Sequence, residues 1–123
     1  MSAPGFRGPR QTWNALCWSM QGLRAAWRHE ASFRLEAGLV VIMLPLGLWL
    51  GDGALEKLAL ITAPLLVLSA ELLNSAIEAV VDKVSPEFNE LAGRAKDMGS
   101  AAVFVLLLLV AASWGLILLP RWL

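Results

Sequence analysis

Four polar side chains recur at helical spacing in an otherwise apolar stretch of the sequence. They are Glu71, Asn74, Glu78 and Asp82. On an α-helix with 3.6 residues per turn, this spacing places all four on one face, which we call the polar stripe. Carboxylates facing lipid would be very costly, so we expect the polar stripe to meet another helix, an ion or a polar cleft.

Three kinds of chemistry fit the polar stripe. Protonated carboxyl groups could hydrogen-bond between helices and hold subunits together. A proton or cation relay in a small transporter also places carboxylates at depth, with Glu71 as the proton site. Catalysis with a metal is the third, and it is favoured by the polar segment at residues 82–97, which a transporter does not require.

Phosphoryl transfer is the reaction that this polar segment suits best. It needs positioning, a metal and a carboxylate that takes up the proton of the acceptor. Arg94 and Lys96 could hold a polyphosphate, and Glu30 and Glu78 could share a magnesium ion. Residues 93–100 do not fit a phosphate-binding loop, and no kinase-type glycine loop occurs, so a nucleotide site here would be of an unrelated kind.

The elements that carry these residues must lie in lipid. Hydrophobic residues make up 58% of the 123 positions and charged residues 16%, and a soluble domain this small would expose much apolar surface to water. The formal net charge of zero argues against a nucleic-acid partner, and the single Cys17 excludes an internal disulfide. We expect one membrane domain over residues 1–123.

The apolar runs predict an all-α membrane protein with three transmembrane helices and an amphipathic helix before them. Residues 98–119 carry no charge and are long enough to cross a hydrocarbon core of about 30 Å. The other spans are predicted at 31–51 and at 57–81, with a cytoplasmic loop at 82–97. Before them we expect a flexible leader at 1–10 and an amphipathic surface helix at 11–28.

Basic residues predict the orientation in the membrane. They precede the first span and lie between the second and third spans, whereas the first loop has only Lys57. The positive-inside rule therefore places the N-terminus in the cytoplasm and the C-terminus outside. Trp49 and Trp122 then fall at the outer interface, where an indole finds both apolar and polar partners.

Several blocks of the sequence resemble a known family. ELLNSAIEAVVD at residues 71–82 and GRAKDMGSAAV at residues 93–103 closely resemble the prokaryotic integral-membrane diacylglycerol kinases. GLRAAW at residues 22–27 is similar to the same family, as are the residues that follow it, Glu30, Ala31, Phe33 and Arg34. The resemblance extends roughly over residues 11–119.

The resemblance implies an architecture and an activity. It implies a homotrimeric helical bundle of three-span subunits in the bacterial inner (cytoplasmic) membrane, each with an N-terminal surface helix. It also implies composite active sites between neighbouring subunits. The implied reaction transfers the γ-phosphate of ATP, with Mg²⁺, to the primary hydroxyl of diacylglycerol and gives phosphatidic acid. The implied partners are therefore diacylglycerol, membrane lipid, ATP and further copies of the chain.

The resemblance also implies roles for individual residues. Glu71 would be the general base and Asn74 its supporting polar partner, while Glu30 and Glu78 would hold the magnesium ion. The residues implied to contact ATP are Arg10, Trp18, Glu30, Glu78, Glu87, Asn89, Lys96 and Asp97. Those implied to contact the lipid substrate are Arg34, Trp49, Glu71 and Ser100.

The sequence departs from the family at a few positions. Relatives often have histidine where Asn89 stands and tyrosine where Trp18 stands. Gln11 occupies the position at which relatives have an arginine that contacts phosphate. Arg10, the nearest arginine of this chain, stands one residue before that position. A sister branch with the same architecture phosphorylates undecaprenol, although GRAKDMGSAAV matches the diacylglycerol branch. The alternative from another class is a small proton-coupled membrane transporter that uses Glu71.

Overall fold

The computed structural model describes residues 8–123, and every regular element in this part of the chain is an α-helix. The helices are α1 (Pro9–His29), α2 (Ala31–Leu50), α3 (Gly53–Val84) and α4 (Glu90–Trp122). The predicted all-α fold is confirmed. Of the leader predicted at 1–10, residues 1–7 lie outside the described residues. Pro9 and Arg10 already belong to α1, because proline suits the first turn of a helix.

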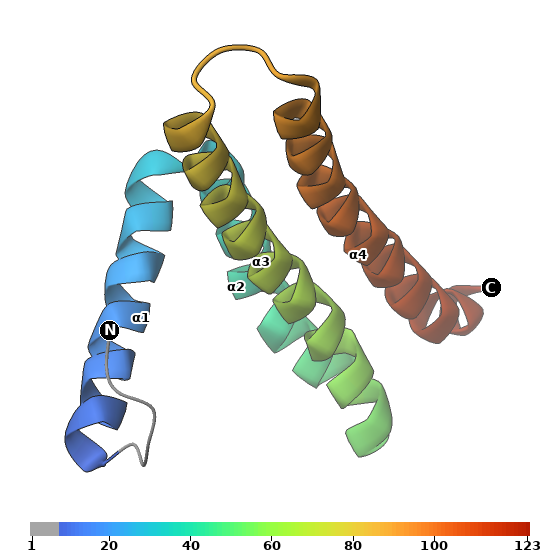
Figure 1. Ribbon diagram of the computed structural model, residues 1–123. Coiled ribbons are helices and arrows are strands. Elements are labelled where there is room, and N and C mark those ends of the chain that lie inside the picture. The colour runs from blue at the N-terminus through green and yellow to red at the C-terminus, as the bar shows by residue number, and fades with distance from the viewer. Residues whose placement is uncertain (1–7) are drawn as a thin grey trace.

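Helix α3 packs between α2 and α4 and forms the centre of the bundle (Figure 1). The α1–α2 junction and the α3–α4 loop lie at one end of the bundle, and the α2–α3 turn and the C-terminus lie at the other. Gly47 allows α2 to approach closely, since a Cβ at this position would stand 3.0 Å from Leu60 Cβ. The buried apolar residues of α3 are Leu60, Ala63, Pro64, Val67 and Ala70.

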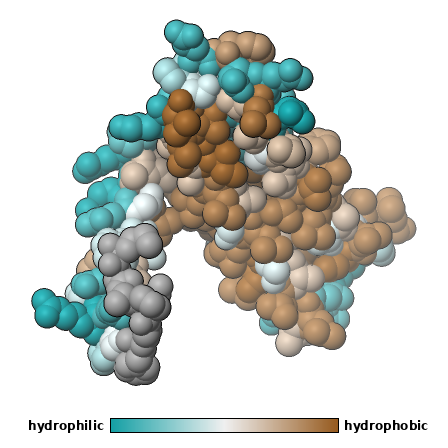
Figure 2. All heavy atoms as spheres, viewed as in Figure 1, coloured by the Kyte–Doolittle hydropathy of each residue, from teal (hydrophilic) through white to brown (hydrophobic). Residues whose placement is uncertain are grey.

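Helices α2, α3 and α4 are each long and apolar enough to cross a membrane. Figure 2 shows apolar side chains over the bundle that these helices form, with polar side chains gathered at its ends and on α1. Many large apolar side chains are exposed in the single chain, among them Val41, Leu73 and Leu116. Such a surface is unfavourable in water and favourable against lipid or another subunit.

Helix α1 diverges from α3 and contacts the bundle near its own C-terminal end (Figure 1). Ala26 is buried, whereas the large residues of the apolar face of α1 are exposed: Trp13, Leu16, Met20, Leu23 and Trp27. Within residues 8–123, the apolar face of α1 is therefore available to lipid or to another subunit.

The corner between α1 and α2 is held by an arginine. Glu30 has an extended backbone and separates the two helices. Arg34 Nη1 donates hydrogen bonds to the carbonyl oxygens of Trp27 at 2.8 Å and Arg28 at 3.3 Å. Because the last carbonyls of a helix have no intrahelical donor, these bonds stabilise the end of α1 and fix the position of Glu30.

The connection between α3 and α4 is shorter than the predicted loop. We expected a loop at 82–97, but α3 continues to Val84 and α4 begins at Glu90. Asn89 caps α4, since its Oδ1 accepts hydrogen bonds from the backbone N–H groups of Leu91 at 2.9 Å and Ala92 at 3.1 Å. The residues after this cap are mostly good helix formers, so the second half of the expected loop is helical.

Pro64 interrupts the hydrogen bonding of α3. Proline has no N–H group, so the carbonyl of Leu60, four residues earlier, loses its intrahelical donor. The indole Nε1–H of Trp114 in α4 donates to this carbonyl at 3.1 Å. A proline is tolerated in this apolar helix because a neighbouring helix satisfies the freed carbonyl.

Arg121 closes the opposite end of the bundle. Its guanidinium group forms an ion pair with Glu56 and donates a hydrogen bond to the carbonyl oxygen of Leu50. Glu56 Oε1 also accepts a hydrogen bond from the backbone N–H of Asp52 at 3.0 Å. These contacts tie the end of α4 to the turn between α2 and α3.

Candidate functional site

The polar stripe of α3 is buried at one end and open at the other. Glu71, Asn74 and Ser75 are buried, Glu78 is half-buried and Asp82 is exposed. Asn74 Nδ2 donates a hydrogen bond to Glu78 Oε1 at 3.1 Å. The stripe therefore leads from the polar end of the bundle to a buried carboxyl group, as its spacing predicted.

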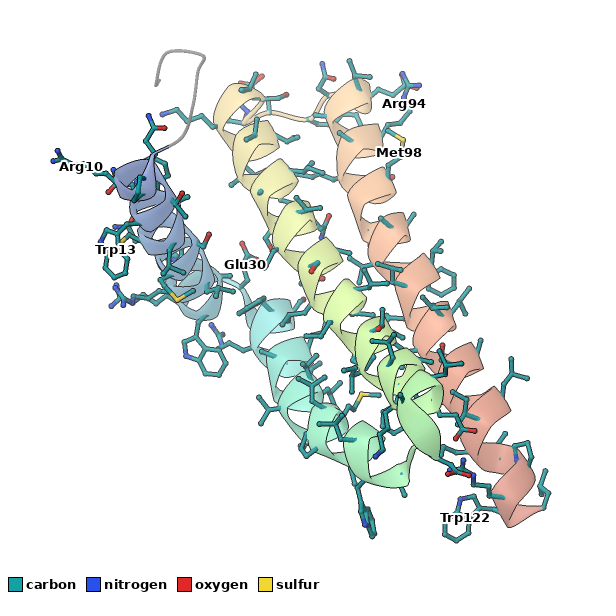
Figure 3. The ribbon with its side chains drawn as sticks, turned by 90° about the horizontal axis from the view of Figure 1, so that it is seen from below. Arg10, Trp13, Glu30, Arg94, Met98 and Trp122 are labelled. Carbon is teal, nitrogen blue, oxygen red and sulfur yellow. The ribbon has the colours of Figure 1, made fainter. Side chains whose placement is uncertain are left out.

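Further carboxyl groups lie close to Glu71. Glu30, Glu36 and Glu78 are all near enough to interact with it electrostatically. Figure 3 shows Glu30 where α1 meets α2, on the side of α3. We call these four residues the carboxylate cluster. Because like charges repel strongly where water is scarce, such a cluster favours a bound cation or a shared proton.

Two residues of α4, one basic and one without a side chain, lie beside the polar stripe. Lys96 Nζ forms an ion pair with Asp82 Oδ1 at 2.6 Å, and it lies within electrostatic range of Glu78. Gly99 is buried against the side chain of Asn74. Lys96 thus places a positive charge at the open end of the stripe.

A groove of about 730 Å³ lies between α1 and α3 beside the carboxylate cluster. Most of its lining is apolar, and Glu30 and Ser75 are among its few polar lining residues. Its volume is in the range of sites that accept small molecules. An apolar group bound in the groove would lie next to the carboxylate cluster, because Glu30 lines the groove.

The structure brings together the residues predicted for chemistry and metal binding. Glu71, Glu30 and Glu78 belong to one cluster, and Asn74 bonds to Glu78. Of the residues predicted to contact ATP, Lys96 also lies at this cluster.

Three other predicted site residues, Arg10, Trp18 and Trp49, lie far along their helices from the α1–α2 corner. Arg10 and Glu30 stand at opposite ends of α1 (Figure 3), about 30 Å apart at 1.5 Å per residue. By the same measure, Trp18 is about 18 Å from Glu30, and Trp49 is about 22 Å from Arg34 along α2. The remaining predicted residues are exposed: Glu87, Asn89, Asp97 and Ser100.

Sequence reasoning missed two neighbours of the polar stripe. Glu36 lies in the span predicted at 31–51, and a carboxyl group in an apolar helix signals a polar partner. Its Oε2 atom is buried without a hydrogen-bond partner in residues 8–123. The second is Gly99, and no local sequence pattern indicates that it contacts Asn74.

The cluster fits a magnesium ion that is bound together with phosphates. Mg²⁺ prefers oxygen ligands and often takes only one or two carboxylates, completing its shell with water and substrate phosphate. Glu30 and Glu78 offer two such carboxylates: Glu30 lines the groove, and Glu78 lies within electrostatic range of Lys96. Within the described part of the chain, no three His, Cys, Asp or Glu side chains are arranged to hold a metal ion by themselves, so water and phosphate would have to supply the other ligands.

Fold and site together define a small integral membrane protein with an acidic site at one end of a three-span bundle. The family model described as prokaryotic diacylglycerol kinase matches residues 17–118, most of the chain. The chain belongs to this family, which confirms the resemblance found in the sequence.

Several similar proteins are named diacylglycerol kinase. The one from Haemophilus influenzae is 48% identical over 105 residues, which are 85% of this chain and 89% of that protein. The one from Escherichia coli is 46% identical over 101 residues, 82% and 83% of the two chains. The one from Pseudomonas aeruginosa is 45% identical over 115 residues, 94% of each. These names do not favour the transporter alternative.

Proposed function

We propose that this protein is an ATP-dependent lipid kinase that transfers the γ-phosphate of ATP to the primary hydroxyl of diacylglycerol, giving phosphatidic acid. The observation that carries the proposal is the carboxylate cluster beside an apolar groove, in a chain of the prokaryotic diacylglycerol kinase family. A lipid hydroxyl needs a proton acceptor that it can reach from the membrane, and a buried carboxylate meets this need.

Glu71 is the proton acceptor in this proposal. The hydroxyl oxygen of the lipid forms a bond to the γ-phosphorus while the bond to the β,γ-bridging oxygen breaks, and ADP leaves with that electron pair. The hydroxyl proton passes to a carboxylate oxygen of Glu71. Asn74 supports the same side of the site through its hydrogen bond to Glu78.

Glu30 and Glu78 are the proposed ligands of Mg²⁺. When bound, the ion would neutralise negative charge on the phosphates of ATP. Lys96 carries the charge needed to contact those phosphates, and the other proposed nucleotide contacts are Arg10, Trp18, Glu87, Asn89 and Asp97. The proposed lipid contacts are Arg34, Trp49 and Ser100.

The protein is further proposed to act as a homotrimer in the bacterial inner membrane, with its N-terminus in the cytoplasm. The distribution of Lys and Arg supports this orientation. The exposed apolar side chains support contact with lipid and with other subunits. Arg10 and Glu30, which α1 holds far apart, would share one ATP only if neighbouring subunits each contribute one of them.

The choice of acceptor tests the proposal. Purified protein in mixed micelles is given γ-labelled ATP with either diacylglycerol or undecaprenol, with and without Mg²⁺. We expect labelled phosphatidic acid that requires Mg²⁺, and little labelled undecaprenyl phosphate. Preferential labelling of undecaprenol would assign the protein to the sister branch, and label in neither lipid would overturn the kinase proposal.

A further inference from the structure

Gly99 of α4 packs directly against the side chain of Asn74, and the space between them is too small for a Cβ atom. A Cβ at position 99 would overlap Asn74 Oδ1 and would stand 3.3 Å from Asn74 Cγ. The same Cβ would be 3.8 Å from the Cα of Asn74, which is an ordinary contact. The conflict is therefore with the amide group and leaves the backbone of α3 untouched.

The amide of Asn74 has a definite orientation. Nδ2 faces Glu78 Oε1, at 3.1 Å, which is the orientation that an ionised Glu78 requires because a carboxylate only accepts hydrogen bonds. Oδ1 then faces Gly99 and is buried without a hydrogen-bond partner in residues 8–123. The bond to Glu78 and the space at Gly99 are thus the two features that keep the amide in this position.

The geometry points to Gly99 as a positioning residue for the candidate active site. The missing side chain at this position lets the Asn74 amide lie across the face of α4 and hold the carboxylate of Glu78. The inference rests on the proposed kinase function, and it adds a residue whose role is exerted through Asn74. Gly99 itself touches neither substrate.

An added methyl group at position 99 has a specific expected effect. The Asn74 side chain can turn away from it, because the overlapping atom is the end of a side chain. Turning away breaks the hydrogen bond to Glu78 while the helices stay in place. Activity should therefore fall much more than stability.

The test compares Gly99→Ala with Gly115→Ala, a matched change on the same helix. Among the described residues, the neighbour that a Cβ at position 115 would contact is Leu119, whose Cδ1 is 3.8 Å away. We expect Gly99→Ala to lower kcat about tenfold or more, the effect of losing one hydrogen bond to a charged group. The thermal midpoint should match that of Gly115→Ala. Wild-type kcat in Gly99→Ala would overturn the inference, and so would a thermal midpoint far below the control, which would make Gly99 a packing residue.

A second comparison separates positioning from other effects. In an Asn74→Ala background the amide is absent, so adding Gly99→Ala should lower kcat no further. An additional tenfold loss in the double variant would show that Gly99 acts independently of Asn74 and would overturn the inference. If the wild-type protein transfers no phosphate to diacylglycerol, the proposed function has failed, which this comparison distinguishes from failure of the role of Gly99.

Discussion

At the residue scale, the candidate site depends on how Glu78 is held. Its Oε1 atom accepts a hydrogen bond from Asn74, and the carboxyl group lies within electrostatic range of both Glu71 and Lys96. A carboxylate fixed by a neighbour in this way is well suited to bind a cation, because little side-chain freedom is lost when the ion arrives.

Glu78→Gln should weaken the dependence of activity on magnesium. Glutamine keeps the shape of the side chain and can still accept the hydrogen bond from Asn74, but it lacks the negative charge. We expect the Mg²⁺ concentration for half-maximal activity to rise by about tenfold or more. The measurement is a magnesium titration of phosphate transfer at saturating ATP.

Glu90→Gln is the matched control, because Glu90 is an exposed carboxylate in the first turn of α4. Its magnesium titration should match that of the wild-type protein. If Glu78→Gln also has the wild-type titration, Glu78 is not a ligand of the metal.

Much of this site could be predicted from sequence because helical spacing determines which residues share a face. Glu71, Asn74 and Glu78 form such a set, and the structure places them on one stripe of α3. The contacts of Glu36 and Gly99 could not be predicted in the same way. They depend on how α2 and α4 are rotated against α3, and a local pattern in one helix carries no information about that rotation.

At the scale of the elements, α3 depends on its neighbours. Pro64 frees the carbonyl of Leu60, and Trp114 of α4 supplies the missing donor. Leu60 and Pro64 are both fully buried, so water does not replace that donor. The pairing of α3 with α4 thus rests partly on a single indole N–H.

Trp114→Phe should destabilise the bundle. Phenylalanine keeps an aromatic ring but removes the N–H, which leaves the Leu60 carbonyl buried and unsatisfied at a cost of about 1–3 kcal/mol. The measurement is the free energy of unfolding in detergent micelles, with Trp122→Phe as the control because Trp122 is exposed near the end of α4.

The loss should be smaller in a Pro64→Ala background. Alanine restores a backbone N–H at position 64 that can donate to Leu60. Equal destabilisation by Trp114→Phe in both backgrounds would mean that the indole hydrogen bond does not compensate for the proline.

Asn89→Ala should lower the free energy of unfolding by about 1 kcal/mol, because it removes the cap of α4. Asn89→Asp should retain most of that stability, since aspartate is an equally good cap. The two variants are compared by denaturation in the same detergent. The capping role would be contradicted if both variants were as stable as the wild-type protein.

The helices were easier to predict than the ends of the polar segment. Uncharged runs such as residues 98–119 identify a span by length alone, and the structure has a helix over each predicted span. Residues 90–97 are rich in charge, which predicts a loop outside the membrane. Because Asn89 caps α4 and good helix formers follow it, α4 instead begins at Glu90. Hydropathy reports where a helix can meet lipid, and it does not report where the helix begins.

At the scale of the whole molecule, the single chain leaves much of its apolar surface uncovered. The large residues on the apolar face of α1 are exposed, and many on α2, α3 and α4 are exposed as well. Lipid can cover part of this surface. Glu71, Asn74 and Ser75 are already buried within this chain, whereas Glu78 is half-buried, and further subunits would separate Glu78 from lipid more completely.

The mass of the detergent-solubilised protein tests the proposed trimer. Native mass spectrometry, with bound detergent removed, should give three times the 13.3 kDa of the chain. A species with the mass of one chain, at protein concentrations where phosphate transfer is observed, would contradict the trimer.

The most direct test of the central claim is phosphate transfer to diacylglycerol by the wild-type protein and by Glu71→Gln, measured beside ATP binding to each. We expect the wild-type protein to make phosphatidic acid and Glu71→Gln to bind ATP normally while making almost none, because only the proton acceptor has been removed. Transfer at the wild-type rate by Glu71→Gln, or loss of its ATP binding with transfer retained, would contradict the role of Glu71.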